Sequence, residues 1–309
     1  MIYRALQICI CIKLFADDTF LCAQNKDFSS LQNEVNAELE KVFIWLASNR
    51  LTLNIKKSKF MIVTKRQSIP SFCVKINDSL LEKCKSYKYL GVVIDEKLKW
   101  EAHINHISPK ISKACGALAR LRNCTNIDVL LNVYHALVHS YLRYGILIWG
   151  NASQSVLDPL QTLVNRAARI MVSAPFGNID FNPAYEFLKI LNVPKTFLLE
   201  TGKYHYKYVN NILPTQIGNY FDTSATQAIR HTYSLRSQNN NRPPRFISKS
   251  KIGEKSIQYK GSQIWNAMPI EIKNCELFAK FKISYKNHLL ETEVDTTIFL
   301  NQTDLLLSS

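Results

Sequence analysis

The alternation of apolar and polar residues near the start of the chain predicts a β-hairpin. Two short apolar runs, residues 8–15 and 19–23, flank the tripeptide Ala16, Asp17 and Asp18. Short apolar runs around a tight polar turn are typical of antiparallel strands. Residues 29–49 then show apolar residues at helical spacing, which predicts an amphipathic helix capped by Ser29 or Ser30.

The next stretch is basic and then apolar. Leu51, Leu53 and Ile55 alternate with polar residues, and three lysines lead into a predicted strand at 60–63. Between residues 41 and 66 the chain holds seven basic residues and no acidic one. Residues 87–95 (YKYLGVVID) predict a strand pair or hairpin, with Gly91 at a bulge or a point of close approach.

From about residue 99 the apolar spacing becomes helical. Residues 101–123, 128–150 and 158–175 each show a period of 3.6, and Pro109, Gly150 with Asn151, and Pro175 with Gly177 punctuate them. Residues 184–213 look helical again, residues 223–256 lose periodicity and predict a partly disordered basic segment, and residues 278–291 predict a final amphipathic helix. The pattern predicts an α+β fold with domains at 1–98, 99–180 and 181–309.

The charge of the chain points to a polyanionic partner. Lys and Arg number 39 and Asp and Glu number 24, which gives a net charge of +15. Nucleic acid is the first candidate, an anionic membrane surface is the second, and a merely basic soluble protein is the bland alternative. No stretch has the length and uniform apolarity of a membrane span. We therefore expect no membrane partner.

The cysteines predict a reducing, intracellular environment. There are eight cysteines at irregular spacing, with no CxxC pair. Free cysteines in apolar runs behave as small hydrophobic residues, so we expect neither a disulfide framework nor a disulfide-linked partner. The apolar start of the chain imitates a signal peptide, but Lys13 interrupts it and a strand is the preferred interpretation. Nucleus and cytoplasm are not distinguished.

Two kinds of residue pair are candidates for metal chemistry. Adjacent carboxylates such as Asp17 and Asp18 either shape a turn or hold hard cations such as Mg²⁺. His103 with His106, and His135 with His139, also have metal-ligand spacing on predicted helices. Because no cluster of Cys or carboxylates accompanies the histidines, packing or phosphate contact is the preferred interpretation for them.

The order of several motifs resembles a known family. The stretch LFADDTFLCA is similar to the catalytic hairpin of reverse transcriptases, LTLNIKKSKFMIV to their Asn-x-x-Lys-Ser/Thr motif, and YKYLGVVID to their primer-grip hairpin. With the helical segments that follow, residues 12–290 resemble the C-terminal part of the reverse transcriptase of non-LTR (LINE-type, jockey-like) retrotransposons. The resemblance implies a partial right-hand polymerase palm with a small antiparallel sheet, followed by a mostly helical thumb and a basic C-terminal region.

The resemblance also implies roles for individual residues. Asp17 would be the metal ligand for two Mg²⁺ ions, Asp18 a supporting acid, and Phe15 the aromatic residue near the primer end. Lys57 would be a general acid or charge clamp at the leaving phosphate, although a solvated lysine is an equal alternative. Asn54 and Ser58 would shape the loop that carries Lys57. Further expected contacts with the RNA template, the DNA primer and the incoming dNTP come from the primer grip (Tyr89, Leu90, Gly91) and from the cations Lys56, Lys59, Lys110, Lys113, Arg120 and Arg122.

The family pattern is incomplete in this sequence. A further palm Asp on an earlier strand is expected, yet only sixteen residues precede Asp17 and none of them is acidic. We therefore predict a reverse transcriptase fragment, truncated at its N-terminus, that does not polymerise DNA by itself. A non-catalytic nucleic-acid-binding remnant is the alternative, and an unrelated basic helical protein ranks third.

Overall fold

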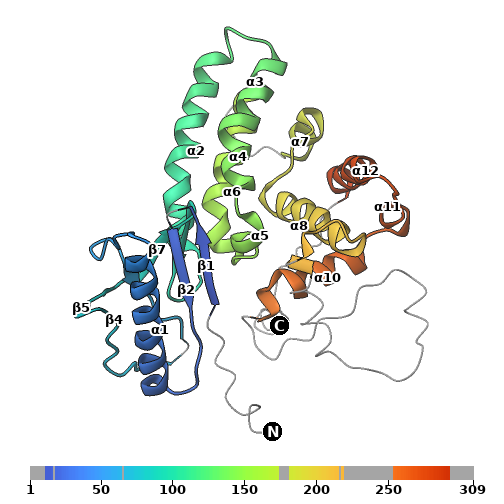
Figure 1. Ribbon diagram of the computed structural model, residues 1–309. Helices are drawn as coiled ribbons and strands as arrows, with labels where there is room; N and C mark the ends of the chain where they lie inside the picture. The colour runs from blue at the N-terminus through green and yellow to red at the C-terminus, as the bar shows by residue number, and fades with distance from the viewer. Residues whose placement is uncertain are drawn as a thin grey trace, which may run out of the picture. The chain divides into compact units, whose positions relative to one another are not determined.

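The chain forms helices and small sheets in the computed structural model shown in Figure 1. The structure describes residues 11–16, 18–64, 66–173, 181–215, 217–218 and 253–292. The α+β class expected from the sequence is confirmed at this level. The chain divides into two units, residues 1–98 and 99–309. Assignment of palm and thumb to these units stays a prediction, as does the subdivision at residue 180.

The first unit contains one long helix and four two-stranded sheets in its described residues. The antiparallel pairs are β1 (Cys11–Phe15) with β2 (Asp18–Cys22), β4 (Lys75–Ile76) with β5 (Ser79–Leu80), and β7 (Ser86–Tyr89) with β8 (Val92–Asp95). The fourth pair, β3 (Lys59–Phe60) with β6 (Glu82–Lys83), is parallel. A single antiparallel sheet, as the sequence suggested, is therefore not what these residues form.

Helix α1 (Phe28–Ser48) follows the predicted amphipathic segment, but its cap differs from the prediction. Asp27, not Ser29 or Ser30, is the N-cap, and its carboxylate accepts a hydrogen bond of 2.7 Å from the backbone N–H of Ser30. A side-chain acceptor at this position satisfies one of the free N–H groups of the first turn. The same bond lowers the pKa of Asp27, because it favours the charged carboxylate.

The predicted strand at 60–63 is shorter in the structure. In β3 only Lys59 and Phe60 pair, with Glu82 and Lys83 of β6. After it, the backbone N–H of Cys84 donates to the carbonyl of Phe60 at 2.9 Å. Side chains of α1 hold the chain that enters β4: Asn36 accepts a bond of 2.9 Å from the backbone N–H of Lys75.

The second unit is helical in its described residues. Its elements are α2 (Glu101–Leu121), α3 (Ile127–Tyr134), the π-helix η1 (His135–His139), α4 (Ser140–Arg143), α5 (Ile146–Trp149), α6 (Gln154–Met171), α7 (Asn182–Leu188), α8 (Val193–Val209), the 3₁₀ turn η3 (Gly253–Lys255), α10 (Ile257–Ala267), α11 (Ile270–Lys273) and α12 (Phe278–Glu291). Helix α2 follows the predicted segment 101–123 and continues through Pro109. Most of the predicted disordered segment 223–256 lies outside the described residues, and its last residues include η3.

The core of the second unit forms where α2 packs on α6, and where α8 packs on α10 and α12 (Figure 1). Fully buried aromatic and aliphatic side chains fill it, among them Ile111, Leu118, Trp149, Leu160, Phe197, Trp265 and Phe281. Among the described helices, none is long and apolar enough to cross a membrane. The seven cysteines that the structure describes all have free thiols.

Candidate nucleic-acid interface

The β1–β2 hairpin carries Asp18 in its second strand and not, as predicted, in a three-residue turn. Strand β2 begins at Asp18, which is exposed and pairs with Phe15, so the connection consists of Ala16 and Asp17. Ala16 has a left-handed φ of 51°. A positive φ at the first residue of a two-residue connection suits the twist of antiparallel strands. Asp17 itself lies outside the described residues.

The described residues do not complete a metal site. Within them, no group of three or more His, Cys, Asp or Glu side chains could hold an ion. Two Mg²⁺ ions need several oxygen ligands in near-octahedral geometry. Asp18 supplies one carboxylate, so the described part of the hairpin does not fit two ions.

The β7–β8 hairpin carries the residues predicted to form the primer grip. Its two-residue turn is Leu90–Gly91, with φ values of 43° and 82°. Positive φ at both positions is the type I′ arrangement that suits hairpins, and it explains the glycine. Gly91 therefore serves this turn instead of the bulge that the sequence suggested.

Tyr89 joins the two hairpins. Its ring lies 5.1 Å from the ring of Phe20, centroid to centroid, with 32° between the planes. Phe20 belongs to β2, two residues after Asp18. The structure thus brings the predicted primer grip against the predicted catalytic hairpin through an aromatic pair.

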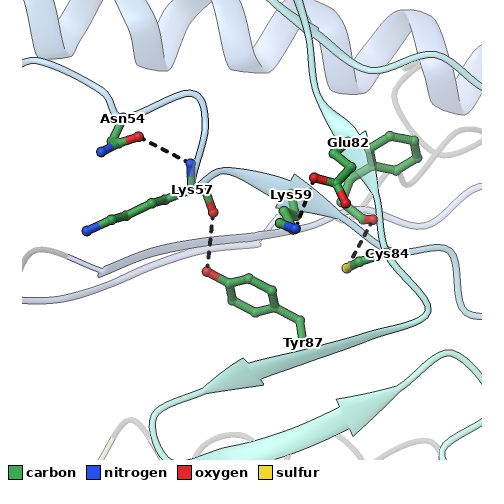
Figure 2. A network of polar contacts seen from close by, with 7 residues as sticks. Asn54, Lys57, Lys59, Glu82, Cys84 and Tyr87 are labelled. Atoms are coloured by element: carbon green, nitrogen blue, oxygen red, sulfur yellow. Dashed lines mark hydrogen bonds and ion pairs between the residues drawn. The ribbon is translucent and has the colours of Figure 1, made fainter.

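The loop that carries Lys57 is held by Asn54. The side-chain oxygen of Asn54 accepts a bond of 3.2 Å from the backbone N–H of Lys57, and its carbonyl accepts one of 3.0 Å from the hydroxyl of Ser58. The ammonium end of Lys57 is exposed and points away from these contacts in Figure 2. The loop is fixed while its cation stays accessible.

Tyr87 connects this loop to the hairpin, a role that the sequence reasoning missed. Its hydroxyl donates to the carbonyl of Lys57 at 3.5 Å (Figure 2). Tyr87 and Tyr89 lie two residues apart on β7 and therefore point to the same side of the strand. That spacing of two tyrosines was the available signal.

The remaining cations of this loop are not equivalent. Lys59 forms an ion pair of 3.0 Å with Glu82, and that contact raises the pKa of Lys59. Lys56 is exposed. Nearby, the thiol of Cys84 donates to the carbonyl of Phe60 at 3.5 Å, and burial raises its pKa, which makes it a poor nucleophile. Of the two lysines predicted here to contact phosphate, Lys59 is therefore paired with Glu82, and Lys56 is the exposed one.

In the second unit, three predicted cations share one side of α2. Lys110, Lys113 and Arg120 are spaced three and seven residues apart, which places them on neighbouring turns of one face. Lys110 lies 3.1 Å from the ring nitrogen of His106 and 5.4 Å from the ring centroid of Tyr141. Arg122 caps the helix and donates to the side chain of Asn123 at 3.3 Å.

His103 is a packing residue in the structure. It is 1% exposed, and its ring lies 5.4 Å from that of Trp149. Burial lowers its pKa to about 4, with smaller contributions from His106 and Lys110. This geometry matches the packing interpretation of the His103–His106 pair.

Comparison with known proteins finds relatives among mobile elements. The chain is 25% identical over 171 residues to the RNA-directed DNA polymerase from mobile element jockey of Drosophila melanogaster, which is 54% of this chain and 18% of that protein. The jockey polymerase of Drosophila funebris is 26% identical over 172 residues, with the same coverage. The probable RNA-directed DNA polymerase from transposon X-element of Drosophila melanogaster is 22% identical over 195 residues, 62% of this chain and 21% of that protein.

These relatives are much longer than the stretch they share with this chain. The chain spans about a fifth of the length of the curated relatives it matches. No protein-family model and no solved structure matches it. The sequence resemblance to the reverse transcriptases of jockey-like, non-LTR retrotransposons is confirmed by these matches.

Proposed function

We propose that this chain is part of a reverse transcriptase of a non-LTR retrotransposon and binds its RNA template and DNA primer. The observation that carries the proposal is β7, whose Tyr89 contacts the Asp18 hairpin and whose Tyr87 contacts the Lys57 loop. Strand β7 of the primer-grip hairpin thus contacts both the Asp18 hairpin and the Lys57 loop, the other two motifs of the family pattern. The names of the relatives and the net charge of +15 support the same function.

The residue roles follow from this proposal. In the intact protein Asp17, with Asp18 in support, would bind the divalent ions that RNA-directed DNA polymerases need, and Mg²⁺ fits carboxylate ligands. Lys57 would stand beside the leaving phosphate, since its backbone is fixed and its ammonium is exposed. Tyr89, Leu90 and Gly91 would contact the primer strand.

Binding of a labelled RNA–DNA hybrid, measured by fluorescence anisotropy, tests the proposal. We expect affinity to fall steeply with salt, because lysines and arginines that contact phosphates release counterions. Lys57→Gln should reduce the slope of log K against log salt by roughly 0.7 to 0.9, the contribution of one phosphate contact. Lys41 is the matched control, since it is paired with Glu38 on α1 at 2.6 Å. Salt-insensitive binding, or none near physiological ionic strength, would contradict the proposal.

Primer extension separates catalysis from binding. Two carboxylates on one turn do not supply enough ligands for two ions, so we expect this chain alone to give no extension with Mg²⁺ or Mn²⁺. Extension that is abolished by Asp17→Ala would show that the chain is catalytic by itself. The alternative function is non-catalytic binding of nucleic acid, which the net charge of +15 supports. In that case the double variant Asp17→Ala/Asp18→Ala binds the hybrid as tightly as the wild type.

A further inference from the structure

A cluster of cations lies in the second unit, on elements far apart in sequence. We call it the α8–α12 cluster. Its members are Lys203 and Lys207 of α8, Lys282 and Lys286 of α12, Arg143 at the end of α4, and Lys189 at the end of α7. The motif order along the sequence gave no hint of this cluster, because it forms only when α12 packs on α8.

Lysines of α8 and α12 meet at the ring of Phe278. On each helix the two lysines are four residues apart and therefore lie on one face, about 6 Å apart along the axis. The ammonium of Lys207 lies 4.9 Å, and that of Lys282 5.3 Å, from the ring centroid of Phe278. One aromatic ring therefore holds a cation from each helix.

Glu200 is the carboxylate that lies among these cations. One of its oxygens, Oε1, accepts from Nε of Arg143 at 3.0 Å and from Nζ of Lys203 at 2.7 Å. The side chains of Glu200 and Lys203 are each only 14% exposed. One negative charge is thus shared between two cations, and the cluster as a whole keeps a large positive excess.

Two histidines extend the cluster onto the π-helix. The rings of His135 and His139 lie 5.2 Å apart and are perpendicular. Burial is the main cause that lowers the pKa of both, and Lys286 lowers it further in each case. His139 also faces Arg143, which acts in the same direction, and Glu200, which opposes it. The histidines are therefore neutral at pH 7 beside several fixed cations.

In the free protein, burial and neighbouring cations disfavour the charged forms of Lys203 and Lys286. Burial is the first cause that lowers the pKa of Lys203 and of Lys286. At Lys203 the contact with Glu200 opposes this shift, and Arg143 and Lys282 add smaller contributions that lower the pKa further. Lys189 lowers the pKa of Lys286 further. Like charges held this close cost free energy, and an anion with repeated charges would relieve that cost.

We propose that the α8–α12 cluster binds the phosphodiester backbone of single-stranded nucleic acid. This inference rests on the proposed function, which is that the chain binds nucleic acid. It adds a binding site for nucleic acid on the second unit. Paired lysines at intervals of about 6 Å suit a polymer with regularly repeated phosphates. Lysines and arginine contact such phosphates without reading the sequence, so the site would be tolerant of base composition.

A lipid surface fits this cluster less well. Helices that lie on membranes insert an apolar face into the bilayer beside their basic residues. Phe281, Tyr285 and Leu289 of α12 are buried inside the unit, and the large apolar side chain that α12 exposes is Ile283, at 62%. One isoleucine is a small apolar surface for insertion into a bilayer, whereas Lys282 presents an exposed cation to a phosphate.

The experiment is binding of a fluorescein-labelled 20-nucleotide oligo-dT to the full chain between 50 and 300 mM salt. We expect the double variant Lys282→Gln/Lys286→Gln to lower the salt slope by about 1.4, which is two contacts of roughly 0.7 each, and to weaken binding on the order of tenfold at 100 mM. Lys280→Gln is the matched control, because residue 280 lies on the opposite side of α12 from residues 282 and 286. Circular dichroism and thermal unfolding establish that each variant is folded.

The outcomes separate this inference from the proposed function. If the wild type binds oligo-dT and the double variant binds equally well, or no worse than Lys280→Gln, the α8–α12 cluster is not the site and the proposed function stands. If the wild type binds neither oligo-dT nor the RNA–DNA hybrid, both fail. If the double variant loses only binding to phosphatidylserine vesicles and keeps its affinity for oligo-dT, the cluster is a lipid site and the inference is overturned.

Discussion

At the scale of single residues, Gly202 shows how closely α8 and α12 approach. A methyl group at this position would lie 2.4 Å from Cε1 of Tyr285, which is 4% exposed, and 3.1 Å from the terminal carbon of Met268. We expect Gly202→Ala to lower the free energy of unfolding by about 1–3 kcal/mol, since buried neighbours must shift to accept the added atom. Urea unfolding at pH 7.5 measures the change.

Gly116 of α2 provides the control for Gly202. It is also helical, but a methyl group there meets nothing within 4 Å. Alanine is favoured over glycine in a helix interior by about 0.8–1 kcal/mol, so Gly116→Ala should stabilise the protein by up to that amount. Equal changes in the two variants would contradict the close approach of α8 to Tyr285.

Residue positions were predictable from sequence where local chemistry decides them. The hairpin within residues 87–95 is one such case, because two short apolar runs predict paired strands, although Gly91 was assigned to a bulge or close approach and not to the turn that it forms with Leu90. The cap of α1 was missed, although Asp27 stands directly before the helix, because Ser29 and Ser30 offer the same chemistry. The partners of Lys57 and Phe20, namely Tyr87 and Tyr89, depend on tertiary packing and had no local signal beyond their spacing.

At the scale of elements, the β1–β2 hairpin and α1 leave apolar side chains exposed. Leu14 and Phe15 are each 62% exposed and Trp45 is 52% exposed, while α1 has no fully buried residue. Leu14 and Trp45 help to line an apolar hollow of about 230 Å³ between the hairpin and the helix. Apolar strands exposed in this way favour association between chains.

We expect Leu14→Lys to reduce concentration-dependent association of the chain, measured by light scattering and sedimentation. The substitution places a charge on the exposed apolar strand, and its stability cost should stay within about 0.5 kcal/mol because the position is largely exposed. Gln24→Lys, at an exposed position beyond β2, adds the same charge without removing apolar surface. If both variants reduce association equally, net charge and not the hairpin surface is responsible.

Helices were more predictable than strands in this chain. The apolar period located α1, α2, α6, α8 and α12, because each has a buried face along many residues. Pairing of β3 with β6 joins residues more than twenty positions apart over two residues only, too short for any periodic signal. Pro109 lies inside α2, within the helical segment 101–123 that the apolar period predicts.

At the scale of the whole molecule, buried histidines make the free energy of unfolding depend on pH. The second unit buries histidines among apolar residues, including His103 and His205, which are 1% and 0% exposed. His205 packs between α8 and α10, with its ring 5.9 Å from that of Trp265 and 5.6 Å from that of Tyr208. A buried imidazole in such surroundings favours its neutral form.

Burial lowers the pKa of His205 to about 4, below the ordinary value of 6.5. Because the unfolded chain takes up a proton near pH 6.5 and the folded chain does not, the stability from this group is complete above pH 6.5. It is lost progressively as the pH falls toward 4. Between pH 7.5 and 5 the loss is about 2 kcal/mol for one such histidine, and most carboxylates remain ionised over that range.

Urea unfolding at pH 7.5 and at pH 5 measures this effect on the full chain. We expect the free energy of unfolding to be lower at pH 5, and His205→Gln to reduce that difference by about 2 kcal/mol even if the variant is less stable at both pH values. Gly116→Ala, which changes no titratable group, should leave the difference unchanged. A wild-type protein equally stable at the two pH values would mean that His205 is protonated in the fold, in conflict with its burial between α8 and α10.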